Sequence, residues 1–83
     1  MLAAHELEKL IDLLETRLRV IADADLRERD PDGQLAQLQA VSEAIVAFRS
    51  EHRPSIPPRL NHFLENFSLQ KALDWAKAEL AKG

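Results

Sequence analysis

The sequence predicts an all-α protein: a small antiparallel bundle of three long helical segments, in a single domain that spans residues 1–83. Apolar residues recur at helical spacing along most of the chain. Neither Gly nor Pro occurs between residues 1 and 30, and the whole chain has only 2 Gly and 4 Pro. Ala and Leu, both strong helix formers, dominate the composition. Together these observations favour helices throughout.

The first segment is expected to be an amphipathic helix that begins near residue 2. Its apolar residues follow one another at spacings of three and four, which places them on one face. They are Leu7, Leu10, Ile11, Leu14, Leu18 and Ile21. Asp25 then occupies the place of the next apolar residue. We therefore expect the helix to leave the core after Ile21; a continuation to Arg29 is the alternative.

Asp30 and Pro31 predict a boundary and a second helix over roughly 31–50. An Asp before a helix can accept hydrogen bonds from its free N–H groups, and Pro suits the first helical position. Glu43 is the only charged residue between positions 33 and 48. So little charge predicts that this helix is the most enclosed segment, between the first helix and the C-terminal helices.

A proline-rich connector precedes the third segment, which is expected to begin near Pro58. A residue before proline is driven out of the α region. Because Pro54, Pro57 and Pro58 each impose this restriction, Arg53, Ile56 and Pro57 are expected to be non-helical.

The third segment is expected to break near Ser68 into two short helices. Its apolar residues form two faces on opposite sides of a continuous helix. The first face holds Leu60, Phe63, Leu64 and Phe67, and the second holds Leu69, Leu73, Ala76 and Leu80. One straight helix cannot bury both in one core, and Ser68 suits the N-cap of a final helix. The alternative is an unbroken helix held by different neighbours on its two sides.

Composition narrows the functional classes. The formal net charge is −3, with the acidic excess in residues 1–30, so no concentrated basic face for nucleic acid is expected. No apolar stretch approaches the ~18–20 residues of a transmembrane helix, and the first residues lack the positive region of a secretory signal. The chain has no Cys for a disulfide or a thiolate metal site. We expect a cytoplasmic protein that does not act at membranes.

Small residues on the second helix predict an association surface. Alanines recur along one side of it at spacings of 4, 4 and 3. With two residues that widen the apolar arc of the first helix, they form the candidate interface: Leu13, Val20, Ala36, Ala40, Ala44 and Ala47. Small side chains let another helix approach closely. The alternative is that Ala, as the best helix former, simply fills a surface.

Helix length gives a second reason to expect association. A first helix that reached residue 29 would be ~42 Å long at 1.5 Å per residue. A compact domain of this size has a diameter of roughly 30 Å. The helix therefore either ends early or projects beyond the core and exposes an apolar arc that needs a partner.

Two polar groups are weaker candidates for a binding site. Arg53, Arg59, His62 and Lys71 lie beside predicted helix starts and could hold an anion such as phosphate or an acidic peptide. Solvated loop charge explains them equally simply. His62 and Glu65 could face a metal from one helical turn, but zinc needs further ligands, which favours a surface histidine.

The sequence carries no catalytic motif. It has no Cys nucleophile, no Gly-rich phosphate loop and no Ser flanked by glycines. So thin a core also leaves little room for a water-excluding pocket of ~300 Å³ or more. We therefore expect neither an enzyme nor a cofactor.

Our hypothesis is a non-enzymatic helical protein–protein interaction module that forms a homodimer or binds another helical protein. The alternative, from a different class, is a small DNA-associated regulator that uses the C-terminal helices (58–82). The weak positive charge of these helices argues against nucleic acid.

Overall fold

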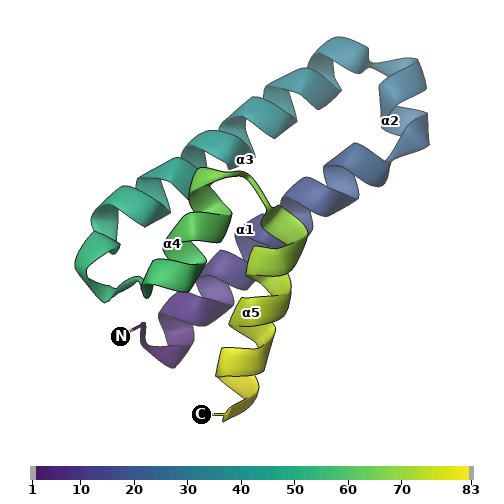
Figure 1. The fold of residues 1–83 in the computed structure, drawn as a ribbon. Coiled ribbons are helices and arrows are strands. Elements are labelled where there is room, and N and C mark those ends of the chain that lie inside the picture. The colour runs from purple at the N-terminus through teal and green to yellow at the C-terminus, as the bar shows by residue number, and fades with distance from the viewer. Residues whose placement is uncertain (1, 83) are drawn as a thin grey trace.

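The computed structural model describes residues 2–82, which form five α-helices, one 3-10 helix and no strand. The predicted all-α class is therefore confirmed. Figure 1 shows α1 and α3 side by side as a hairpin, joined at one end by α2, with α4 and α5 packed toward the other end. The elements are α1 (Ala4–Ala22), α2 (Ala24–Arg29), α3 (Pro31–Glu51), η1 (Arg53–Ser55), α4 (Pro58–Glu65) and α5 (Leu69–Lys82).

Helix α1 is the central helix of the molecule. It packs along both α3 and α5, and its Leu10 and Leu14 are completely buried. Helix α3 buries only Val41, Ile45 and Phe48. The prediction that the second long helix would be the most enclosed is therefore wrong. Its exposed uncharged positions between residues 33 and 48 are mostly Ala and Gln, which a helix can present to water at little cost.

The core lies where α4 and α5 cover the hairpin. Helix α5 brings two completely buried alanines to it, so this helix approaches its neighbours closely. The described residues measure 41 × 23 × 20 Å, and the hairpin projects beyond the core toward α2 (Figure 1). The core side chains are Leu2, Leu7, Leu10, Leu14, Ile45, Phe48, Ile56, Leu60, Leu64, Leu69, Ala72, Leu73 and Ala76.

Two aspartate caps build the tip of the hairpin. Helix α1 ends at Ala22, where the apolar pattern fails, so a single helix through the tip does not form. Asp23 Oδ1 accepts the N–H of Leu26 at 3.0 Å and starts α2. Asp30 Oδ1 accepts the N–H of Gly33 at 2.9 Å and starts α3, as its position before Pro predicts.

The connector after α3 combines a 3-10 turn with extended backbone. Ile56 and Pro57 are extended, as expected of residues that precede proline. The same expectation is wrong for Arg53, which begins the 3-10 helix. Its carbonyl accepts the N–H of Ile56 at 3.3 Å, and the carbonyl of His52 accepts the same N–H at 3.0 Å. These bonds hold Arg53 in the turn.

The predicted break near Ser68 is confirmed, and it is a Schellman motif. The N–H of Ser68 donates to the carbonyl of Phe63 at 2.9 Å, and the N–H of Phe67 donates to that of Leu64 at 3.2 Å. Phe67 adopts φ 51°, in the left-handed region where Gly is usual. Ser68 then takes the N-cap position of α5, where its carbonyl accepts the N–H of Ala72 at 3.0 Å.

One carboxylate ties the start of α1 to the end of α3. Glu6 Oε1 accepts the N–H of Ala3 at 2.8 Å, and Glu6 Oε2 lies 2.9 Å from Nδ1 of His52. His52 caps α3, and its ring centroid lies 4.4 Å from that of Phe48. The hydrogen bond from Ala3, followed by the electrostatic effect of His52, lowers the pKa of Glu6.

Acid is expected to weaken this connection. Because the pKa of Glu6 in the folded protein lies below its ordinary value of 4.5, ionised Glu6 stabilises the fold above that pH and loses its effect as the pH falls further. Glu6→Gln should therefore flatten the decline of the unfolding free energy below pH 4.5, measured by urea denaturation at a series of pH values. Glu8→Gln, at an exposed position of the same helix, is the control. Equal slopes in the two variants would contradict the role of Glu6.

Candidate functional site

A shallow apolar groove runs between α1 and α3. Its volume is about 340 Å³. Val20, Ala40 and Ala44, three residues of the predicted interface, help to line it. The full lining is Thr16, Val20, Gln37, Ala40, Val41 and Ala44. Only Thr16 and Gln37 bring polar side chains, so the groove suits an apolar helix surface.

The remaining residues of the predicted interface lie close to the ends of this groove. Leu13 is half-buried on α1, one turn from the groove, and packs against the core. Ala36 and Ala47 continue the helical spacing of Ala40 and Ala44 on α3, and both are exposed. The alanine row therefore faces solvent along much of its length.

The groove lies on the side of the hairpin that α4 and α5 leave open. Arg49 donates to Asn61 of α4 at 2.7 Å, and it lies nine positions after Ala40, roughly 180° around α3. Lys77 of α5 pairs with Glu15 at 3.2 Å, and Glu15 lies five positions before Val20, roughly 140° around α1. Both covering helices thus contact the hairpin away from the groove.

The tip of the hairpin adds further apolar surface. Ile21 is 41% exposed and Leu35 is 57% exposed, large fractions for aliphatic side chains near the ends of long helices. Leu35 lies nine positions before Ala44, roughly 180° around α3, and Ile21 lies seven positions after the buried Leu14, on the core face of α1. This exposed apolar surface at the tip is therefore separate from the groove.

The four residues of the predicted anion site fall into separate surroundings. Arg53 and Lys71 line different hollows of the surface. The guanidinium carbon of Arg59 lies 6.0 Å from the ring centroid of Phe63, and the His62 ring centroid lies 6.2 Å from the same ring. The structure thus brings Arg59 and His62 to one aromatic side chain but does not gather all four residues.

The pair considered for a metal is engaged in other contacts. Glu65 accepts a hydrogen bond from Arg49 at 2.8 Å, and Nδ1 of His62 lies 3.3 Å from the side-chain nitrogen of Asn66. Within residues 2–82, no three His, Asp or Glu side chains come together as metal ligands.

Two lysines of α5 lie in ion pairs. Lys77 pairs with Glu15 at 3.2 Å, and Lys82 pairs with Glu79 at 3.0 Å. These carboxylates offset positive charge that DNA association through residues 58–82 would need.

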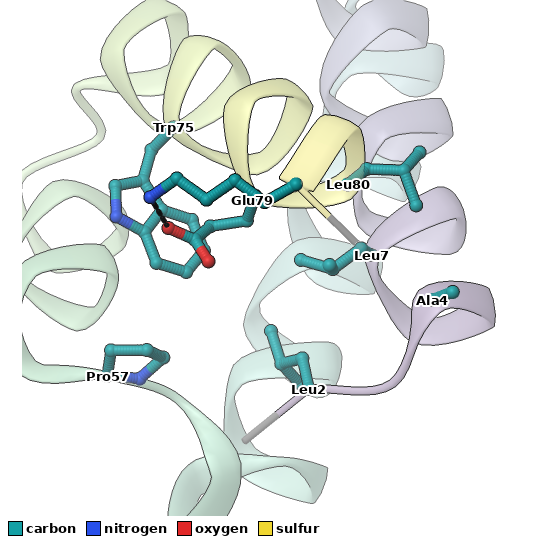
Figure 2. A pocket seen from close by; sticks show the side chains of 8 residues that line it. Leu2, Ala4, Leu7, Pro57, Trp75, Glu79 and Leu80 are labelled. Atoms are coloured by element: carbon teal, nitrogen blue, oxygen red, sulfur yellow. Dashed lines mark hydrogen bonds and ion pairs between the residues drawn. The ribbon is translucent and has the colours of Figure 1, made fainter.

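A second pocket, which the sequence analysis did not predict, lies where the start of α1 meets the end of α5 (Figure 2). It is a partly open hollow with a volume of about 310 Å³, not a water-excluding cavity. The pocket forms at the edge of the core, where three segments meet, rather than inside it. Its lining is Leu2, Ala4, Leu7, Pro57, Trp75, Glu79, Leu80 and Lys82.

Comparisons with known proteins give no match. No protein-family model matches the chain, and neither do the curated proteins or the solved structures searched. In the described part of the chain, no helix has the length and apolar character needed to cross a membrane.

Proposed function

We propose that the protein is a non-enzymatic, cytoplasmic helical interaction module that forms a homodimer through the α1–α3 groove. The observation that carries this proposal is the position of the groove. It is apolar, and it lies on the side of the hairpin that α4 and α5 leave open. The proposed interface is the set of residues Leu13, Val20, Ala36, Ala40, Ala44 and Ala47.

Small side chains favour a helix as the occupant of this surface. Ala40 and Ala44 line the groove without filling it, so the backbone of a second helix can come close. Packed helices lie roughly 8–10 Å apart, depending on the side chains between them, and alanine favours the short end of that range. A second copy offers the same alanine row, which is the self-complementary arrangement that a two-fold dimer requires.

Charge introduced at the alanine row tests the proposal. The native protein is expected to have twice its chain mass of 9.4 kDa in light scattering on a sizing column. Ala40→Glu combined with Ala44→Glu should reduce this to 9.4 kDa and leave the helical circular dichroism intact, because buried unpaired carboxylates oppose association.

The matched control combines Ala78→Glu with Ala81→Glu, at exposed positions of α5. This variant should remain dimeric. A dimer that survives the Ala40 and Ala44 changes would remove the groove from the interface. A native protein that is monomeric over a wide concentration range would instead favour a helix of a different protein as the partner.

A further inference from the structure

We propose that the pocket between α1 and α5 binds a small organic ammonium ion with an apolar body, such as an alkylammonium, and that Glu79 is its anionic partner. This site is separate from the proposed dimer interface. It lies at the other end of α1, and none of its lining residues belongs to the α1–α3 groove.

The walls of the pocket suit an aliphatic chain. Leu2 and Leu7 are nearly buried, and Leu80 and Pro57 complete the apolar lining (Figure 2). The volume of about 310 Å³ equals that of roughly ten water molecules at ~30 Å³ each. A cavity of roughly half this size can hold benzene, so a six-carbon chain with a polar head fits.

The ion pair between Glu79 and Lys82 at the pocket favours a positively charged ligand. Glu79 Oε1 lies 3.0 Å from Nζ of Lys82, and the two side chains are 21% and 72% exposed respectively (Figure 2). Lys82 can therefore leave Glu79 for water at little cost, and a ligand ammonium can take its place. A ligand carboxylate would instead have to separate Glu79 from Lys82 and lie beside a half-buried like charge, which is unfavourable.

Trp75 adds a second group that attracts cations. It lies one turn before Glu79 on α5, and Figure 2 shows the two side chains together on one side of the pocket. The face of an indole ring attracts an ammonium group, most strongly where water is partly excluded. Glu79 also lies in the last turn of α5, where the helix end carries partial negative charge.

The fluorescence of Trp75, the only Trp in the chain, can report binding directly. Hexylammonium, hexanol and hexanoate share one alkyl chain and differ in the charge of the head group. Hexylammonium should change the emission saturably and bind about tenfold more tightly than hexanol, with hexanoate weakest. The proposal is overturned if hexanoate binds as tightly as hexylammonium, or if none of the three gives a saturable change.

Two variants test whether Glu79 and Lys82 cause the preference for a cationic head group. Glu79→Gln should bring hexylammonium and hexanol to equal affinity. Lys82→Ala should strengthen hexylammonium binding, because the Lys82 ammonium no longer competes with the ligand for Glu79. Lys77→Ala is the matched control, since Lys77 pairs with Glu15 outside the pocket. A charge preference that persists in Glu79→Gln, with circular dichroism unchanged, rejects Glu79 as the partner.

Binding of hexylammonium by the Ala40 and Ala44 double variant should equal that of the native protein, which separates this proposal from the dimer.

Discussion

Replacing Leu14 by Ala is expected to lower the free energy of unfolding by about 3 kcal/mol. Leu14 is completely buried on the central helix, so its truncation leaves a cavity that neighbouring helices can close only in part. A protein of this length has a total stability on the order of 4–12 kcal/mol, so this one change would remove a large share of it. Urea denaturation followed by circular dichroism measures the effect.

Leu35→Ala provides the control, because it makes the same chemical change on another long helix. Leu35 is 57% exposed, so its truncation should alter the unfolding free energy by less than about 0.5 kcal/mol. Equal losses at Leu14 and Leu35 would show that α1 is not the central helix of the core.

Enlarging Ala76 to Leu is expected to destabilise the protein by about 2 kcal/mol, although Leu is nearly as good a helix former as Ala. Ala76 is completely buried on α5, where three additional carbon atoms would force the helix away from its neighbours. Thermal and urea denaturation should both show the loss.

Ala78→Leu makes the same change two residues away, at an exposed position of the same helix. It should leave the unfolding free energy nearly unchanged. If Ala76→Leu proved equally neutral, then α5 would not pack closely on the core.

Element boundaries could be predicted wherever neighbouring residues decide them. Asp30 with the following Pro fixes the start of α3, and the reversal of the apolar face marks the break before Ser68. The left-handed backbone at Phe67 could not be predicted in this way, because Gly is the residue that normally signals it. There the two Schellman hydrogen bonds override the local preference of the side chain.

The enclosure of α3 and the positions of the pockets depend on how distant segments of the chain meet, so the sequence predicts them less well. A nearly uncharged helix looks the same in sequence whether it is covered on all sides or lined with exposed alanines, and α3 is of the second kind. The groove was partly predictable because Ala40 and Ala44 share a helix face. The pocket beside Trp75 was not, because it joins the start of α1, Pro57 and the end of α5, which helical spacing does not relate.

The central position of α1 has a consequence for synthesis on the ribosome. Helix α1 packs against α3 and α5, and α5 is the farthest of the described helices from it along the chain. Until α5 is available, an α1–α3 hairpin has an uncovered apolar side on which α5 later packs. A chaperone that shields nascent apolar segments would find its target on this hairpin and would be displaced when α5 emerges.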